Sequence, residues 1–369
     1  MSTTFTEANY ENSIIELFEN MGYQHVYGPN IERDFYSPLY NDVLIEHIHS
    51  LNPSLPEEAV SDAMYKLQNY EAGDIVQKNE VFMDYLQHGI PVRYTAGGEQ
   101  CSSLAYIDNI SFIIANQWTF VENSNKRPDI ILFVNGLPLV LVELKSPSRE
   151  ETDASEGYTQ IRNYIHEIPS MFIYNCICVI SDHLTSKAGT ITSDEDRFME
   201  WKTKDGNYEN TQHAQFDTFF EGMFDKTRLL DIIKNFICFS NEGLEKYKIL
   251  AGYHQYFAVK KAVEMAKKAV NTDGKGGVFW HTQGSGKSLS MVFYAHLLQE
   301  ALDSPTIVVI TDRNDLDDQL FGQFTKCSSF LRQVPVHATC RKLGVNASKE
   351  DIGLKDWLNG RKANGIIFT

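Results

Sequence analysis

Hydrophobic residues recur along this chain at two spacings, one typical of helices and the other typical of strands. Over residues 10–22 they stand at positions 14, 15, 17, 18 and 21, and the stretch ends at a glycine. Apolar residues three or four positions apart line one face of a helix, and glycine commonly follows a helix end. We therefore expect an amphipathic helix here. Residues 38–105 read as further helices, broken at Pro53, Pro56 and the pair Gly97-Gly98.

From about residue 109 the pattern changes to that of strands, with many β-branched and aromatic side chains. Two of the apolar runs are separated by Asn135-Gly136, a pair that favours the tight turn of a hairpin. The expected elements are strands over 110–121, 129–134, 138–145 and 175–181 and a helix over 157–168. Residues 1–225 are therefore predicted to form an α/β domain, with a mixed sheet flanked by helices.

A second α/β pattern follows a partly helical connector at residues 226–248. Its strands alternate with helices, as is typical of a parallel sheet. The expected elements are helices over 256–270 and 289–302 and strands over 277–281, 306–312 and 365–369, with one more helix before the last strand. A domain does not normally end on a strand that should be central in a parallel sheet. We therefore expect residues 249–369 to form an incomplete lobe of something longer.

Charge and composition narrow the classes of protein that fit. The chain has 33 Lys and Arg against 49 Asp and Glu, and residues 1–90 alone carry 15 acidic and 3 basic side chains. This balance argues against a generic basic nucleic-acid coat and puts any DNA-facing surface later in the chain. We expect Cys176 and Cys178 to be buried thiols on one strand face. The polar N-terminus and the lack of a long apolar run predict a soluble, cytoplasmic protein.

The predicted hairpin carries charged residues at its open end. Asp129 opens the first strand, and Glu143 and Lys145 finish the second on one face, because side chains alternate along a strand. Two carboxylates can hold Mg²⁺, and an ammonium can orient water or neutralise charge on a phosphodiester. The alternative is a hairpin that ends in ordinary solvated charges.

The register of the hairpin decides whether these side chains can meet. A two-residue turn at Asn135-Gly136 pairs Asp129 with Val142, and Glu143 would then point away from Asp129. A shared metal site needs one extra residue, either in the loop or in a bulge. We predict such an irregularity.

Residues 127–147, RPDIILFVNGLPLVLVELKSP, resemble the PD-(D/E)xK nuclease core in the motor-and-cleavage subunit of type I restriction enzymes. The resemblance implies a restriction-endonuclease-like fold for the first domain. It also implies that Asp129 and Glu143 hold a magnesium ion and that Lys145 supports the attacking water.

Three further residues extend this resemblance. Gln160 and Tyr164, four positions apart on a predicted helix, match an accessory motif of the family and could hold the DNA backbone. Glu11 stands where the family carries a helical glutamate that assists the metal site. The alternatives are surface packing for Gln160 and Tyr164 and a solvated helix acid for Glu11.

A glycine loop, HTQGSGKS at residues 281–288, lies between a predicted strand and a predicted helix. The backbone of Gly284, Ser285 and Gly286 could curl around a phosphate, Lys287 could reach the β- and γ-phosphates, and the Ser288 hydroxyl could bind the magnesium of the nucleotide. The strict pattern has glycine at position 281, where this chain has His281, which we expect to support the loop. The loop nevertheless resembles the motor motif of the same family, which implies a RecA-like lobe that binds ATP.

Two neighbouring segments fit this motor. Gln255 resembles the glutamine with which superfamily 2 helicases read the adenine edge, and residues 311–320, TDRNDLDDQL, resemble the motor segment that contacts the DNA backbone. The alternatives are a solvated glutamine and an acidic helix start. No acidic motif and no second motor lobe follow, so we expect weak ATP binding at best and no useful turnover.

The resemblance implies a magnesium-dependent endonuclease that cleaves double-stranded DNA as the restriction part of a type I enzyme. The full subunit would pump DNA with ATP and assemble with methyltransferase and specificity subunits, and S-adenosylmethionine would be bound by the methyltransferase partner. An assembly and DNA-docking module, or an ATP-gated switch, with an inactive nuclease centre is the alternative.

Overall fold

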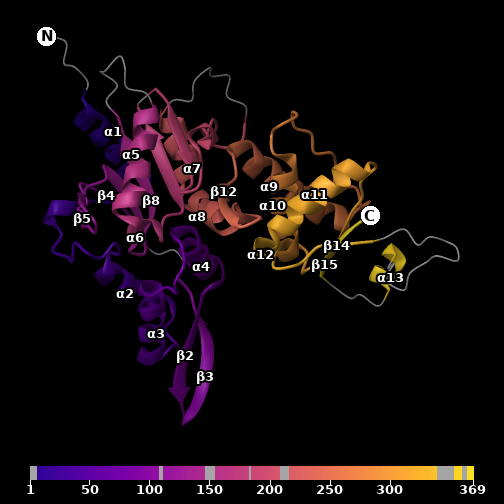
Figure 1. Ribbon diagram of the computed structural model, residues 1–369, viewed down its shortest axis with the longest axis horizontal. Coiled ribbons are helices and arrows are strands. Elements are labelled where there is room, and N and C mark those ends of the chain that lie inside the picture. The colour runs from indigo at the N-terminus through magenta and orange to yellow at the C-terminus, as the bar shows by residue number, and fades with distance from the viewer. Residues whose placement is uncertain are drawn as a thin grey trace. The chain divides into compact units, whose positions relative to one another are not determined.

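The structure is a computed structural model that describes residues 6–107, 111–145, 154–182, 184–207, 216–338, 353–359 and 364–369. The chain divides into two compact units, Met1–Ile237 and Cys238–Thr369 (Figure 1). This division falls inside the expected connector at residues 226–248. The two boundaries drawn from the sequence, at 225 and 249, stay predictions.

A six-stranded mixed sheet forms the centre of the first unit, as predicted. Its strand order is β1-β4-β7-β8-β9-β10. β1 is parallel to β4 and β8 is parallel to β9, whereas the other neighbours are antiparallel. The strands are β1 Gln24–Tyr27, β4 Phe112–Asn116, β7 Ile130–Val134, β8 Leu137–Leu144, β9 Ile177–Ser181 and β10 Ser186–Gly189. The strands expected from the hydrophobic pattern are the central ones, and the edge strands β1 and β10 were not expected.

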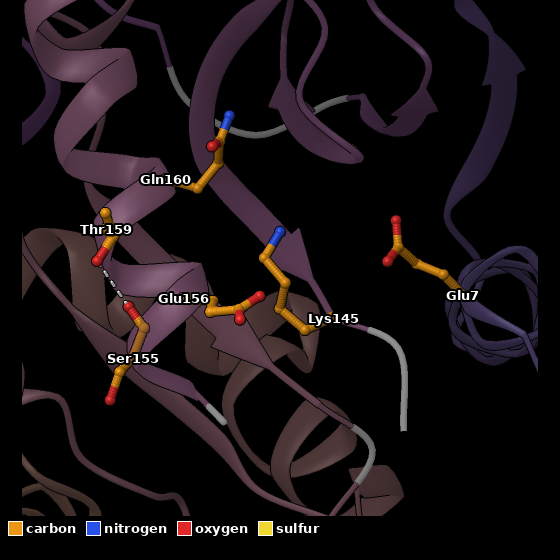
Figure 2. A pocket seen from close by; sticks show the side chains of 6 residues that line it. All are labelled: Glu7, Lys145, Ser155, Glu156, Thr159 and Gln160. Carbon is orange, nitrogen blue, oxygen red and sulfur yellow. Dashed lines mark hydrogen bonds between the residues drawn. The ribbon is translucent and has the colours of Figure 1, made fainter. Parts of the chain in front are cut away.

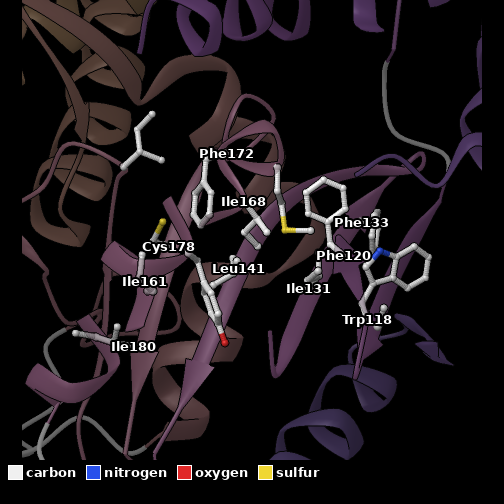
Figure 3. Packing of buried hydrophobic residues seen from close by; sticks show 14 of the residues in the cluster. Trp118, Phe120, Ile131, Phe133, Leu141, Ile161, Ile168, Phe172, Cys178 and Ile180 are labelled. Carbon is white, nitrogen blue, oxygen red and sulfur yellow. The ribbon is translucent and has the colours of Figure 1, made fainter. Parts of the chain in front are cut away.

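Helices and sheet share a continuous apolar core. Odd-numbered residues such as Ile131 and Leu141 are buried in one cluster with Ile161 and Tyr164 of α5 (Figure 3). Even-numbered residues on the opposite face of the sheet, such as Leu132, are equally buried. Complete burial of each large apolar side chain stabilises the fold by about 1.5–3 kcal/mol. The helices of this core are α1 Glu7–Asn20, α5 Ala154–Glu167, α6 Pro169–Phe172, α7 Phe216–Phe224 and α8 Lys226–Asn235.

The two cysteines expected in the core are there, since Cys176 and Cys178 have no exposed surface. Aromatic rings bind the helices α1 and α7 to each other, with the ring centroids of Phe18 and Phe220 5.6 Å apart. Short elements complete the central part of the unit: η1 Gly28–Asn30, β5 Phe120–Val121, β6 Asn125–Lys126 and η2 Glu195–Arg197.

A smaller lobe extends from the sheet of the first unit (Figure 1). It contains α2 Asn41–Leu51, α3 Glu57–Gln68, α4 Ile75–His88, β2 Ile90–Ala96 and β3 Glu99–Ala105. The prediction of helices as far as residue 105 is wrong over its last part, because β2 and β3 form an antiparallel hairpin that turns at Gly97-Gly98. A Gly-Gly pair favours such a turn. Side chains of α3 also accept backbone N–H groups of β2, from Arg93 to Asp62 and from Thr95 to Glu58.

The second unit holds the predicted parallel sheet. β15 lies between β13 and β14 and is parallel to both. The elements of this unit are β11 Ile237–Glu242, β12 Glu245–Leu250, α9 Tyr253–Val270, α10 Lys287–Ala301, β13 Thr306–Val309, α11 Asn314–Lys326, α12 Ser328–Leu331, β14 Val336–His337, α13 Leu354–Leu358 and β15 Gly365–Phe368.

The strand expected over residues 277–281 is not formed. Val278 is 95% exposed and Trp280 is 79% exposed, and the segment carries no strand hydrogen bonds to the described residues. A strand requires a neighbour for its backbone N–H and C=O groups, and the described part of this unit places none beside it. The apolar pattern alone could not supply that neighbour. Across the described ranges, no helix combines the length and apolar character needed to cross a membrane.

Candidate active site

An extra residue in the hairpin places the two predicted metal ligands on the same side of the sheet. Near the turn Phe133 pairs with Pro138, whereas one step further Leu132 pairs with Val140, so Leu139 is the extra residue. The irregularity predicted from the register is thus confirmed as a β-bulge. Beyond it Ile130 pairs with Val142, so the preceding position, Asp129, comes opposite Glu143.

Hydrogen bonds hold these charged groups at the ends of β7 and β8. Oδ2 of Asp129 accepts the backbone N–H of Leu144 at 2.7 Å, and Nζ of Lys145 donates to Oε1 of Glu143 at 2.6 Å. Glu143 is only 4% exposed, and its other oxygen, Oε2, is buried without a hydrogen bond to any described residue. A buried carboxylate oxygen without a partner is costly, so this atom is suited to a cation.

Carboxyl groups outnumber ammonium groups at this point. Burial and then the charge of Glu143 raise the pKa of Asp129 to about 8, against the opposing effects of the Leu144 N–H and Lys145. Burial also raises the pKa of Glu143, although Lys145 and Tyr164 favour its charged form. Burial lowers the pKa of Lys145, but the negative charges of Glu143 and Asp129 outweigh burial, so that the pKa of Lys145 is raised.

The donor set fits magnesium. Mg²⁺ prefers oxygen ligands and commonly binds one or two carboxylates while it keeps several waters. Asp129 and Glu143 supply two such carboxylates. In the described ranges no group of three or more His, Cys, Asp or Glu is arranged to hold a metal.

A pocket of about 420 Å³ opens beside Lys145. Figure 2 shows Glu7 of α1 on one side of Lys145 and Glu156 and Gln160 of α5 on the other. The remaining lining residues are Ser155 and Thr159, also on α5. The structure therefore brings the predicted Gln160 to the same pocket as Lys145, through the face of α5 that begins beside the end of β8.

Tyr164 lies one turn further along α5 and is buried in the core cluster next to Glu143. Burial and the charge of Glu143 raise the pKa of its hydroxyl, which keeps the proton on the oxygen. Gln160 and Tyr164 are thus close to the carboxylates, on the face that their spacing predicted. Their contact with a DNA backbone stays a prediction.

Glu11, the predicted helical acid, is engaged elsewhere. Its Oε1 accepts the side-chain amide of Asn116 at 2.6 Å, and its Oε2 accepts that of Gln117 at 3.2 Å. Glu7, one turn earlier on α1, lines the pocket instead. The sequence argument missed Glu7, and the available signal was that residues four apart on a helix share a face.

The glycine loop of the second unit precedes α10, which begins at Lys287. Nζ of Lys287 donates to the backbone carbonyls of His281 at 3.1 Å and of Thr282 at 2.8 Å. Gly286 has φ +76°, in the left-handed region that glycine adopts without strain. The loop thus combines a helix N-terminus, a lysine side chain and glycine backbone N–H groups. Groups of these kinds commonly bind a phosphate.

Gln255 contacts this loop directly. It is buried, its Oε1 accepts the N–H of Gly252 at 2.9 Å, and its Nε2 donates to the carbonyl of Gly286 at 3.0 Å. His254, which the sequence argument missed, lies beside the carbonyl of Ser285 at 3.1 Å. Gln255 is therefore not solvated, and its contact with adenine stays a prediction, as does the binding of nucleotide by Gly284 and Ser288.

Family models match residues in both units of the chain. The family model described as "Type I restriction enzyme R protein N terminus" matches residues 4–197, and the model described as "SWI2/SNF2 ATPase" matches residues 254–369. The HindI type I restriction enzyme endonuclease subunit of Haemophilus influenzae is 36% identical over 387 residues, which cover 98% of this chain and 36% of that protein. A putative MjaIXP endonuclease subunit of Methanocaldococcus jannaschii is 32% identical, over 86% of this chain and 34% of that protein. The chain spans about a third of the length of these relatives.

Proposed function

The chain belongs to the family of type I restriction enzyme R proteins, and we propose that its first unit is a magnesium-dependent endonuclease for double-stranded DNA. The observation that carries this proposal is the bulge at Leu139. It sets Asp129 opposite Glu143 and leaves Lys145 beside both. Without the bulge, the two carboxylates would lie on opposite faces of the sheet.

Each of these residues has a distinct task in the proposed reaction. Asp129 and Glu143 would hold Mg²⁺, which when bound activates water and stabilises the charge that builds on a phosphodiester. The Lys145 ammonium, now bonded to Glu143, can turn to orient the attacking water or to neutralise that charge. Gln160 offers a side-chain N–H₂ group to a phosphate oxygen at the pocket, and the Tyr164 hydroxyl stabilises the charged form of Glu143.

In the second unit the glycine loop would bind ATP. The backbone N–H groups of Gly284, Ser285 and Gly286 would face the phosphates, and Ser288 would face the magnesium of the nucleotide. Lys287 would exchange its two carbonyl partners for phosphate oxygens. In a complete subunit this lobe would couple ATP to DNA translocation, in assembly with methyltransferase and specificity subunits.

The test compares three versions of the chain on supercoiled plasmid DNA with Mg²⁺, namely the wild type, Lys145→Ala and Lys66→Ala. Lys66 is the matched control, because it also pairs with an acid, Asp62, at 2.9 Å, but on the smaller lobe. Removal of an electrostatic group of this kind should lower the cleavage rate by about 100-fold, whereas Lys66→Ala should leave it unchanged.

Binding of Mn²⁺, followed by electron paramagnetic resonance, should depend on Asp129 and Glu143 in the same proteins. Equal nicking by the wild type and Lys145→Ala would contradict the assignment of catalysis to this site. Metal binding without any cleavage would favour a docking module or switch with an inactive centre.

A further inference from the structure

Glu11 sits at the centre of a chain of side-chain hydrogen bonds. The Nδ2 of Asn116 and the Nε2 of Gln117 each donate to one of its oxygens. The other end of the Asn116 amide, Oδ1, forms a hydrogen bond with Nε2 of His25 at 2.9 Å. Because a carboxylate only accepts hydrogen bonds, the Nδ2 end of the Asn116 amide faces Glu11 and the Oδ1 end faces His25. Both oxygens of Glu11 are therefore occupied by protein donors.

These donors come from the turn that ends β4. The backbone N–H of Gln117 donates to the carbonyl of Asp129 at 3.3 Å, as the last rung between β4 and β7. At this rung Gln117 has φ +53°, a left-handed conformation that residues other than glycine rarely adopt. Gly28 lies against the same turn, where an added Cβ would come within 2.7 Å of the Gln117 carbonyl. The turn thus has an unfavourable backbone conformation and is in contact with Glu11 on one side and with Gly28 on the other.

We propose that Glu11 is a positioning residue that holds Gln117 in this left-handed turn and so fixes the backbone of Asp129. The inference rests on the proposed function, because it gives Glu11 a task only where Asp129 is a metal ligand. The route is short: the Glu11 carboxylate binds the Gln117 side chain, the Gln117 N–H binds the Asp129 carbonyl, and the Asp129 carboxylate faces Glu143. Glu11 acts through the protein, and a metal ion is not its partner.

The variant Glu11→Gln tests this route with little change in shape. A carboxamide has one oxygen for two donors, and its own N–H₂ group would face the donor of Asn116 or Gln117. We expect the turn to open and the backbone N–H of Gln117 to exchange its hydrogen at least tenfold faster. We expect Mn²⁺ to bind about tenfold more weakly, because small displacements of a catalytic group carry effects of this order. Glu16→Gln, at an exposed position of the same helix, is the matched control and should change neither value.

The second substitution, Gln117→Gly, separates positioning from direct ligation. Glycine adopts φ +53° without strain, so the turn no longer needs the clamp. In the double variant Glu11→Gln/Gln117→Gly, Mn²⁺ affinity should return to within about threefold of the Gln117→Gly value. If Glu11 were a metal ligand, the full loss would persist whatever residue stands at position 117, and that result would overturn the proposal.

Failure of the proposed function would look different. A wild-type chain that does not bind Mn²⁺ at all would remove the nuclease proposal. Hydrogen exchange at Gln117, read by mass spectrometry of the segment around it, needs neither metal nor DNA. Unchanged exchange in Glu11→Gln would refute the positioning role by itself.

Discussion

The raised pKa of Asp129 predicts how the stability of the metal-free protein depends on pH. Burial and the charge of Glu143 raise this pKa to about 8 in the folded state, whereas the unfolded chain keeps the ordinary value of 3.8. Between these values the folded protein binds a proton that the unfolded chain does not. The stabilisation is therefore complete at acid pH and is lost as the pH rises through 8.

The size of the effect follows from the two pKa values. From pH 6 to pH 9 a single isolated group with these pKa values would lose roughly 3 kcal/mol of unfolding free energy. Asp129 is partly exposed and shares its protons with Glu143, so we expect about 1–2 kcal/mol. Asp129→Asn cannot ionise, and its side-chain oxygen can still accept the Leu144 N–H. The variant should therefore lose the part of this pH dependence that Asp129 causes, while the part from Glu143 stays, and it should be more stable than the wild type at pH 9.

Urea denaturation in the presence of a chelator measures this difference. Substitution of Trp280 and Trp357 by Phe leaves Trp118 and Trp201 as the only tryptophans, and both lie in the first unit. Their fluorescence then reports that unit alone.

Asp62→Asn is the contrasting control. Burial opposes ionisation of Asp62, but Lys66 and the Arg93 N–H outweigh it and lower its pKa, so this substitution should destabilise the protein at neutral pH. Stability that rises from pH 6 to pH 9, or a pH dependence that Asp129→Asn leaves undiminished, would refute the reasoning.

Two further substitutions test the pocket and the glycine loop. Glu7→Gln removes a negative charge from the pocket, one that adds to the effects of burial and Glu143 in raising the pKa of Asp129. The site then loses part of its attraction for cations. We expect Mn²⁺ binding, measured by electron paramagnetic resonance, to be about threefold weaker. Gly286→Ala adds a Cβ 2.7 Å from Nε2 of Gln255, while Gly284→Ala, with a similar φ, meets nothing within 4 Å. Backbone strain should weaken the binding of a fluorescent ATP analogue in both variants. We expect a loss of about fivefold in Gly284→Ala and a clearly larger loss in Gly286→Ala. Equal losses would contradict the role given to the Gln255 contact.

The hairpin of β7 and β8 illustrates what a sequence can and cannot predict. The turn residues and the alternation of strand side chains show that an extra residue is needed, but not where it lies. The structure places it at Leu139, whose carbonyl accepts the N–H of Cys176 at 2.7 Å. The position of the bulge is thus tied to the pairing of β8 with β9, a contact between segments distant in sequence. Local pattern carries no information about such a contact.

Which of Glu7 and Glu11 reaches the pocket also depends on contacts between segments distant in sequence. Both lie on one face of α1, so helical spacing cannot tell which of them reaches the pocket. The position of the helix is set by contacts such as the hydrogen bond between the buried hydroxyls of Tyr10 and Ser181, the latter at the end of β9. Residues 277–281 illustrate the opposite error, since an apolar pattern predicted a strand for which the described residues provide no neighbour.

The two lysines of the predicted sites are held in the same way. Lys145 bonds to the carboxylate of Glu143, and Lys287 bonds to the carbonyls of His281 and Thr282. Lys145 is half-buried and its ammonium needs an acceptor, whereas Lys287 is exposed; in both places the acceptor is supplied from a few residues away along the chain. Ligand binding at either site is therefore an exchange of partners, in which a cation takes over Glu143 or a phosphate takes over Lys287. Because the free energy of an exchange is the difference between old and new partners, phosphate affinity at the glycine loop should rise when the contacts of Lys287 with the two carbonyls are weakened and the lysine is kept. At the other site Glu143 is itself a proposed metal ligand, so a weaker acceptor there should lower the affinity for a cation.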